Sequence, residues 1–355
     1  MACERKEETM DVRAYAAMAA GDELVPWSFT RRDLGAHDVA IDITHSGICH
    51  SDIHRVREEW QSQVFPIVPG HEIIGLVTAV GDGVSRFSVG QRVGVGVYID
   101  SCRECENCLS GEGNYCEKGM IETFAGFEKD GVTPTQGGYS TGIVVDENYV
   151  LSVPEGLDSA AGAPLMCAGI TVYAPLERFG AGPGKRVGVV GLGGLGHLAV
   201  RFAKAMGAEV TVFSHSLNKR EDALELGADH FVYSDDSEHM ESLSKSLDIV
   251  VNTVSAPLDP APYLSLLGLG GVLVFVGISG QPYPVNAFDL LNQRRMIAGS
   301  TIGSVAQLQQ MLDFAAEHGV EASVEVISAS DINAAYERVI NSDVHYRFVI
   351  DASTF

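Results

Sequence analysis

The clearest chemical signal in the sequence is a group of four cysteines within fifteen residues: Cys102, Cys105, Cys108 and Cys116. Their spacing, C-x2-C-x2-C-x7-C, lets the thiolates converge on one tetrahedral Zn²⁺ with Zn–S bonds of about 2.3 Å, and four protein ligands leave no position for water. The surrounding segment has almost no apolar side chains, so metal binding would couple directly to its folding. We therefore expect a structural zinc site in a lobe at residues 101–117. An iron–sulfur cluster and uncoordinated thiols are the alternatives.

The cellular compartment bears on whether these cysteines form disulfides instead. The N-terminal stretch MACERKEETMDVRAYAAM has no apolar segment and no small-residue cleavage site of the secretory kind. We expect a cytoplasmic protein, and disulfides are rare in a reducing compartment. The total of seven cysteines is also odd, which argues against a fully paired framework.

Composition narrows the class of protein further. A chain of 355 residues with 46% apolar content can build two hydrophobic cores. Its formal net charge of −23 would repel nucleic-acid phosphates and anionic lipid, so we expect neither as a partner. The most apolar runs, such as GVLVFVGI, have the length of a strand and fall far short of the roughly 20 residues that span a bilayer.

The pattern of apolar residues changes near residue 168. Before that point, short alternating runs punctuated by glycine predict a compact, barrel-like β domain. After it, short apolar runs alternate with helical patterns, as in a parallel sheet covered by helices. The last fifty residues contain a helical pattern, SVAQLQQMLDFAAEHG, and a terminal strand, YRFVID. Periodicity alone does not say which domain this tail joins.

A glycine-rich turn lies between an apolar strand and an amphipathic helix. Gly191, Gly193 and Gly196 form G-x-G-x-x-G, and the next strand ends about twenty residues later. The glycines permit a tight turn and close approach of the backbone, and the N-terminus of the helix offers N–H donors to a pyrophosphate. This context predicts a dinucleotide-binding site.

The end of that next strand distinguishes the two nicotinamide dinucleotides. NAD sites place an Asp or Glu there to bind the ribose 2′-hydroxyl, whereas this chain carries Ser214, His215 and Ser216, followed by Lys219 and Arg220. No carboxylate stands where it would repel a 2′-phosphate. The sequence therefore favours NADP(H).

Several segments together, in their order and spacing, resemble the zinc-dependent medium-chain alcohol dehydrogenases. The likeness is greatest to the cinnamyl alcohol dehydrogenase-like subgroup, which includes bacterial broad-range NADPH-dependent aldehyde reductases. It covers about residues 12–351. The segments that carry it are GICHSDIH, PGHEIIG, the four-cysteine lobe, CAGITVY, GLGGLG and YRFVID.

The resemblance implies a second zinc site, which spacing alone would not have revealed. By this likeness Cys49, His71 and Cys167 hold a catalytic zinc, with water or substrate in the fourth position. Two thiolates balance the charge of Zn²⁺ and an open position allows it to polarise a carbonyl, so the chemistry agrees with the likeness.

The resemblance also assigns roles around this zinc and the cofactor. Asp52 would orient the imidazole of His71, and Glu72 would be an alternate ligand. Ser51 and His54 would form the proton relay to solvent. Thr171 would lie beside the nicotinamide and Arg347 would contact the pyrophosphate. Further cofactor contacts are expected at Gly194, Leu195, Val276 and Gly277.

The implied architecture is α/β, with two domains. A GroES-like β-rich catalytic domain would comprise residues 1–167 and 304–355, and a doubly wound parallel Rossmann sheet would occupy residues 168–303. In this family dimers form by pairing the edges of the Rossmann sheets, so we expect a homodimer.

The expected function is reversible hydride transfer between NADP(H) and primary alcohols or aldehydes, including aromatic and medium aliphatic ones. Plant members of the lignin pathway carry a pocket Trp shortly after the fourth cysteine of the lobe, whereas this chain reads GMIETFAGF. We expect pocket contributions from Trp60, Tyr98, Phe124 and Ile302. The alternatives are a polyol dehydrogenase, whose third catalytic ligand is Glu, and a catalytically silent NADPH-binding protein, which would have lost zinc ligands. The seventh cysteine, Cys3, has no role in this scheme.

Overall fold

The computed structural model describes residues 10–355, so Cys3 lies outside the described residues. The chain divides into two compact units. The first contains the chain up to Cys167 together with Ser304–Ala316 and Glu321–Phe355. The second contains Ala168–Gly303 and Glu317–Val320.

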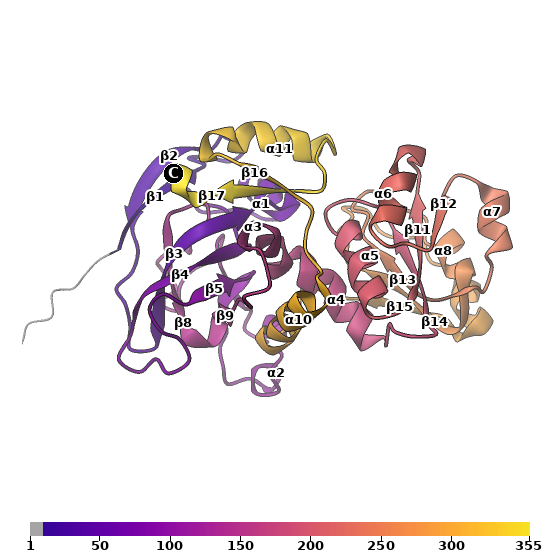
Figure 1. Ribbon diagram of the computed structural model, residues 1–355, viewed down its shortest axis with the longest axis horizontal. Coiled ribbons are helices and arrows are strands. Elements are labelled where there is room, and N and C mark those ends of the chain that lie inside the picture. The colour runs from indigo at the N-terminus through magenta and orange to yellow at the C-terminus, as the bar shows by residue number, and fades with distance from the viewer. Residues whose placement is uncertain (1–9) are drawn as a thin grey trace, which may run out of the picture. The chain divides into compact units, whose positions relative to one another are not determined.

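The first unit is built on a seven-stranded sheet. Its path runs β16 (Val324–Ile327), β17 (Arg347–Asp351), β3 (Asp38–Gly47), β4 (Ile73–Val80), β5 (Arg92–Val95) and β9 (Leu151–Ser152), and β8 (Gly142–Asp146) also pairs with β3. Figure 1 shows the yellow β17, from the end of the chain, beside the indigo β3. The terminal strand predicted at YRFVID is therefore confirmed, and it joins the sheet of the first unit.

Two short hairpin pairs and several helices complete this unit. The hairpins join β1 (Asp11–Ala16) to β2 (Val25–Thr30) and β6 (Tyr98–Asp100) to β7 (Ile121–Glu122). Its helices are α1 (His50–Val56), α2 (Glu106–Leu109), α3 (Ser159–Gly162) and α11 (Ile332–Ile340). The helix predicted at SVAQLQQMLDFAAEHG is α10 (Val305–His318), which crosses the boundary at Ala316.

A shared hydrophobic core holds α1 in place. Ile53 and Val56 of α1 are buried with Ile332 and Val339 of α11 in one cluster. Because α1 presents this apolar side to the core, its remaining residues are held in fixed positions. Those residues include Ser51, Asp52 and His54, which the family resemblance assigned to the catalytic site.

The second unit is a six-stranded, wholly parallel sheet. The strand order is β12 (His230–Tyr233), β11 (Glu209–Ser214), β10 (Arg186–Val190), β13 (Leu247–Asn252), β14 (Leu267–Phe275) and β15 (Met296–Gly299). This is the doubly wound order, in which the direction of winding reverses between the first and fourth strands. Its connecting helices are α4 (Ala168–Arg178), α5 (Gly196–Ala205), α6 (Arg220–Glu225), α7 (Ser237–Ser242), α8 (Ala261–Leu266) and α9 (Ala287–Leu291). The predicted Rossmann sheet is confirmed.

The helices of the protein are short relative to a membrane span. Among residues 10–355, no single helix is long and apolar enough to cross a bilayer. One bent pair, Ser159–Met166 and Ala168–Arg178, meets the criteria only when its two helices are taken together.

Candidate active site and metal centres

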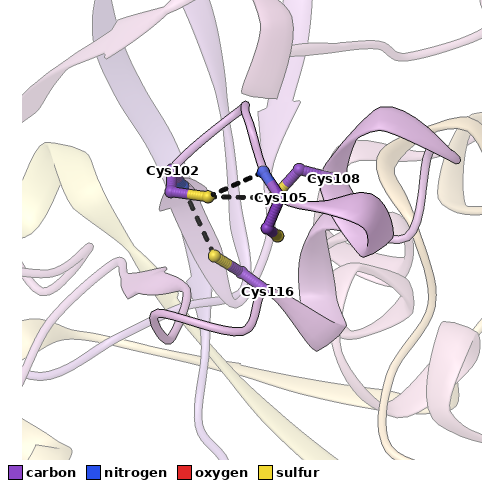
Figure 2. A group of neighbouring side chains, drawn as sticks. All are labelled: Cys102, Cys105, Cys108 and Cys116. Carbon is purple, nitrogen blue, oxygen red and sulfur yellow. Dashed lines mark hydrogen bonds between the residues drawn. The ribbon is translucent and has the colours of Figure 1, made fainter.

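The four cysteines of the lobe converge as their spacing predicts. Their sulfur atoms all lie within 4.8 Å of one another, and Figure 2 shows the four side chains gathered around a common space. The Cys102 and Cys108 sulfurs are 3.8 Å apart. A tetrahedron with arms of about 2.3 Å has edges of about 3.8 Å, so this separation fits a Zn²⁺ at the centre. No disulfide joins the six cysteines among the described residues.

Polar contacts rather than an apolar core support this lobe. The Ser101 hydroxyl lies 3.3 Å from the Cys108 sulfur and 2.8 Å from the Tyr149 hydroxyl. Arg103 donates two hydrogen bonds of 2.8 Å to Asp100. Leu109 is 74% exposed, so it contributes nothing to packing within the lobe. A bound metal is the remaining source of folding energy for this segment, in agreement with its composition.

A second group of metal-ligating side chains lies in the first unit. The ligand atoms of Cys49, His71, Glu72 and Cys167 are within 4.8 Å of one another. The structure thus brings together the three residues that the family resemblance assigned to a catalytic zinc, with Glu72 beside them. Two thiols and one imidazole are ligands that Zn²⁺ accepts, and a three-residue set leaves room for a fourth ligand.

Strand pairing explains why these distant residues meet. In the antiparallel pair of β3 and β4, Ser46 is opposite Ile73, and the Gly47 N–H donates to the Glu72 carbonyl at 2.9 Å. Residues that follow β3 therefore lie beside residues that precede β4. The short helix η3 (Ala163–Met166) packs against both strands and ends at Cys167.

The carboxylate of Asp52 fixes the orientation of His71. It is fully buried, and one of its oxygens lies 2.9 Å from His71 Nδ1. The other ring nitrogen, Nε2, is then left for the metal. Burial lowers the pKa of His71, but the charge and hydrogen bond of Asp52 outweigh burial and raise that pKa well above its usual value. A metal bound at Nε2 would take the place of that proton.

The two thiols of this site are not equivalent. The hydrogen bond with Cys167 lowers the pKa of the Cys49 thiol well below its usual range, and His71 and Arg347 act in the same direction. A thiol with a lowered pKa loses its proton more readily, and thiolates are the form that binds Zn²⁺.

Glu72 makes a buried ion pair that the sequence did not predict. Its Oε1 accepts a hydrogen bond from Arg347, while its Oε2 is buried without a partner. Burial raises the pKa of Glu72 to about 7, against the opposing charge of Arg347. The unpartnered oxygen suits the alternate-ligand role expected for this residue. Space for it exists because residue 47 is glycine: a Cβ there would lie 2.1 Å from Oε2.

The position of Arg347 bears on its expected contact with a pyrophosphate. The residue is 6% exposed and belongs to the first unit, where its guanidinium is engaged by Glu72. Its structural role is to hold that carboxylate, and the pyrophosphate contact stays a prediction.

The expected relay residues lie on α1. The Ser51 hydroxyl is 3.6 Å from the Cys49 sulfur, next to the candidate catalytic zinc site. His54 follows one turn later, its Nδ1 is hydrogen-bonded to Glu59, and its ring stacks on Trp60 with centroids 4.7 Å apart. The side chain of His54 is 27% exposed, so it reaches solvent. Sequence reasoning missed Glu59, because a glutamate five residues from a histidine has no distinctive spacing.

The four expected pocket residues have different surroundings. The ring of Phe124 is stacked on His71, with centroids 5.6 Å apart. Tyr98 instead packs edge-on against Tyr149, which also contacts the cysteine lobe through Ser101. Trp60 is 40% exposed and lies against His54, and Ile302 is buried in the second unit. Phe124 and Trp60 thus contact residues of the expected site, whereas the ring of Tyr98 packs against Tyr149.

The glycine-rich turn has the geometry that dinucleotide binding requires. Gly191 has φ of +87°, which favours glycine, and a Cβ at Gly196 would lie 2.1 Å from the Gly191 carbonyl oxygen. A Cβ at Gly193 would meet nothing within 4 Å, so space is open above the turn. Gly194 and Leu195 complete the turn and α5 begins at Gly196. The first and third glycines therefore serve the turn and its packing, and the second leaves room for a ligand.

The end of β11 carries the residues expected to select the dinucleotide. Ser214 is the last residue of the strand and is 7% exposed, and its hydroxyl accepts a hydrogen bond of 3.1 Å from the Ser216 N–H. The Ser214 hydroxyl proton is still free to be donated. Lys219 closes the following turn, Arg220 begins α6, and His215 is exposed.

The other expected cofactor contacts also lie in the second unit. Thr171 is buried on α4. Val276 and Gly277 follow β14, and a Cβ at Gly277 would lie 2.4 Å from the Val254 carbonyl oxygen. Their contacts with a cofactor stay predictions.

A β-rich unit with a three-ligand metal site, a four-cysteine lobe and a Rossmann unit together define a zinc-dependent dehydrogenase. The chain matches the alcohol dehydrogenase GroES-like domain over residues 35–155 and the zinc-binding dehydrogenase family over residues 194–317. It therefore belongs to the zinc-dependent medium-chain alcohol dehydrogenases.

Individual relatives place it more closely. The chain is 55% identical to "NADP-dependent alcohol dehydrogenase C 1" of Mycolicibacterium smegmatis, over 97% of this chain and 98% of that protein. It is 51% identical to "Probable cinnamyl alcohol dehydrogenase 3" of Oryza sativa subsp. japonica, over 97% of this chain and 94% of that protein. A solved cinnamyl alcohol dehydrogenase from Sorghum bicolor superimposes with a TM-score of 0.93 at 46% identity, covering 97% of this chain and 98% of that one. The expected resemblance to the cinnamyl alcohol dehydrogenase-like subgroup is confirmed.

The two metal centres should respond differently to loss of a ligand. Cys102→Ser removes one of four thiolates from a segment without its own core, so we expect loss of about one zinc per chain together with a marked fall in the unfolding temperature. Cys49→Ser should lose activity and largely keep the fold, because that site lies against a packed sheet. Elemental analysis and thermal unfolding of both variants check this. An active wild-type protein that contains no zinc would contradict both assignments.

Proposed function

We propose that the protein is a zinc-dependent alcohol dehydrogenase that transfers a hydride reversibly between NADP(H) and primary alcohols or aldehydes. The observation that carries this proposal is the convergence of Cys49, His71 and Cys167, of which His71 and Cys167 are buried and Cys49 is partly exposed. Zinc held by these ligands supplies a Lewis acid for the alcohol or carbonyl oxygen, and the nicotinamide supplies or accepts the hydride. The first unit is then the catalytic domain and the second the NADP-binding domain.

Residues of the chain can carry the proton released by alcohol oxidation to solvent. Oxidation of an alcohol to an aldehyde releases one hydride to NADP⁺ and one proton to solvent. Ser51 lies next to the metal ligand Cys49, and His54 is one helical turn away and partly exposed. An imidazole exchanges protons readily near neutral pH, which suits it to pass the proton outward. The hydrogen bond between His54 Nδ1 and the accepting carboxylate of Glu59 fixes the ring of His54 for that task.

The end of β11 supports NADP(H) rather than NAD(H). Neither Ser214 nor the two residues after it carries a negative charge to repel a 2′-phosphate. Hydroxyl donors and the cationic Lys219 and Arg220 follow the strand instead, and charge-assisted hydrogen bonds are about twice as strong as neutral ones. The name of the Mycolicibacterium smegmatis relative, which specifies NADP, supports the same choice.

The substrate class follows from the site and the relatives. The buried ring of Phe124 stacks on the metal ligand His71, so an aromatic face lies directly beside the reacting centre. The rice and sorghum relatives are cinnamyl alcohol dehydrogenases by name. We therefore favour aromatic alcohols and aldehydes of the cinnamyl and benzyl type, together with medium aliphatic ones. A polyol dehydrogenase is disfavoured because its third ligand would be Glu, and a silent protein because all three ligands are present.

We further propose a homodimer through the open edge of the Rossmann sheet. β15 is the last strand of that sheet, with no neighbour on its outer side among the described residues. Large apolar side chains are exposed on and near it: Phe288 is 69% exposed, Leu291 70% and Met296 46%. An exposed apolar sheet edge left uncovered invites aggregation, so a second copy of the chain is a suitable cover.

A cytoplasmic location is also proposed. Both metal sites need cysteines as free thiolates, and the six described cysteines carry free thiols. A reducing compartment preserves that state.

A panel of alcohols and aldehydes assayed with both cofactors tests the function. We expect kcat/KM with NADPH to exceed that with NADH by at least about tenfold, or roughly 1.4 kcal/mol. Ser214→Asp and Lys219→Ala should each reduce the NADPH value far more than the NADH value. Lys204→Ala is the matched control, since Lys204 pairs with Asp229 elsewhere in the same unit. A wild-type enzyme that uses both cofactors equally would contradict the prediction that the residues at the end of β11 select NADP(H).

Removing the relay imidazole should change the pH dependence of alcohol oxidation. With His54→Gln, we expect kcat/KM for alcohol oxidation to fall, and most at low pH, where solvent base is scarcest. The measurement is kcat/KM for alcohol oxidation as a function of pH. His37→Gln serves as the control, because His37 is exposed and pairs with Glu147 instead. Identical pH profiles for wild type and His54→Gln would show that His54 is not part of the proton relay.

Charges placed at the sheet edge should dissociate the dimer. The double variant Phe288→Asp, Leu291→Asp adds two negative charges to a chain that already carries a net charge of −23, so like-charge repulsion opposes association. We expect a monomer by light scattering, whereas Val89→Asp, at a 64% exposed position of the first unit, should leave the mass unchanged. A wild-type protein that is already monomeric would contradict the proposed dimer.

A further inference from the structure

The carboxylate of Asp52 accepts four hydrogen bonds, two on each oxygen. Oδ1 accepts from the Gly70 N–H at 3.0 Å and from His71 Nδ1 at 2.9 Å. Oδ2 accepts from the Cys49 N–H at 2.9 Å and from the Tyr139 hydroxyl at 2.9 Å. Two of these donors belong to metal ligands and a third to the residue before His71. The fourth, Tyr139, comes from a different part of the chain and belongs to no motif in the sequence.

The main chain holds Tyr139 firmly beside the loop that carries His71. The residue is fully buried, its N–H donates to the Pro69 carbonyl at 2.9 Å, and the Gly138 N–H donates to the Gly70 carbonyl at 2.9 Å. Gly70 has φ of +104°, and a Cβ there would lie 2.6 Å from the Tyr139 ring. The ring thus occupies space that only glycine at position 70 leaves open, so the hydroxyl cannot swing away from Asp52 without disturbing the loop.

The protonation of this phenol suits the role of donor. Burial, reinforced by the negative charge of Asp52, raises the pKa of Tyr139 well above its usual value. The hydroxyl therefore keeps its proton, and the carboxylate is the acceptor within reach. A buried carboxylate is stable only when its oxygens are hydrogen-bonded, and loss of one donor leaves an oxygen short of partners in a site closed to water.

We propose that Tyr139 is a positioning residue for the catalytic zinc site, acting through Asp52 on His71 and Cys49. The Tyr139 hydroxyl and the Cys49 N–H share one carboxylate oxygen, and His71 is held by the other. Without the hydroxyl, Oδ2 keeps only the bond from the Cys49 N–H, so the carboxylate is held less firmly and both ligands are oriented less precisely. Groups that orient metal ligands in this way typically change metal affinity by about 10- to 100-fold when removed. The inference rests on the proposed function of the Cys49–His71–Cys167 set.

The chain provides a matched control beside this tyrosine. Tyr336 on α11 is 7% exposed, and its ring lies edge-on to that of Tyr139 with centroids 6.3 Å apart. Its hydroxyl is buried and makes no hydrogen bond with Asp52. Tyr336→Phe therefore removes a buried hydroxyl from the same core without removing a donor from the carboxylate.

The test measures zinc affinity rather than turnover. Zinc-loaded wild type, Tyr139→Phe and Tyr336→Phe are titrated with dipicolinate, and the release of the two zinc ions per chain is followed. We expect Tyr139→Phe to bind one of its two zinc ions at least about tenfold more weakly, with the other unchanged. Tyr336→Phe should match wild type. In cobalt-substituted protein, only Tyr139→Phe should alter the absorption of the catalytic centre. In an Asp52→Asn background, Tyr139→Phe should produce no further loss.

Other outcomes would overturn the proposal. One is a Tyr139→Phe variant with wild-type zinc affinity and an unchanged cobalt spectrum. Another is an equal loss of zinc affinity in Tyr336→Phe. A third is a Tyr139→Phe chain that does not fold even when supplied with zinc. The last would show that the hydroxyl serves the fold and not the metal site. Wild-type protein that binds two zinc ions but oxidises no alcohol would instead reject the proposed function, and the affinity comparison would still be interpretable.

Discussion

The proposed catalytic centre depends on one constraint, the placement of β3 between β17 and β4 in the sheet of the first unit. Val349 of β17 is opposite Gly47 at the end of β3, and Ser46 is opposite Ile73 at the start of β4. The chain leaves β3 towards Cys49 at the point where the other two strands bring Arg347 and His71. A shift of one residue in either pairing would displace Cys49, His71 and Arg347 relative to one another by about 3.3 Å. Strand register therefore sets the metal site.

Charge balance is the second requirement of this centre. Asp52, Glu72 and Cys167 are buried acidic groups, Cys49 is partly exposed, and the basic side chain of Arg347 is paired with Glu72. Burying several negative charges around one positive charge is unfavourable unless hydrogen bonds and a cation compensate. Asp52 is compensated by four donors, and Glu72 by Arg347. A divalent cation is the natural partner for the thiolates, so the electrostatics of the fold and the chemistry of the reaction call for the same ion.

The two metal centres obtain their stability in different ways. The catalytic set is built from side chains fixed by a packed sheet, by η3 and by α1, so most of its geometry exists before a metal binds. The lobe is short and mostly polar, and the convergence of its four sulfurs is the main contact among its residues. One centre is therefore preorganised by the fold, whereas the other organises its own segment.

The sequence by itself determined the features whose contacts are local. The four cysteines fall within one short segment, so their spacing alone predicted that their sulfurs would meet. The glycine-rich turn and the serine at the end of the next strand likewise follow from the neighbouring residues of one strand–turn–helix unit. The three catalytic ligands lie in separate segments, and only family resemblance pointed to them.

Tertiary structure alone decided the partners of buried side chains. The pairing of Arg347 with Glu72, the packing of Tyr98 against Tyr149 and the hydrogen bond from Tyr139 to Asp52 join residues between 51 and 275 positions apart. Such contacts depend on strand order, register and the space left by glycines, and a single sequence carries no local pattern for them.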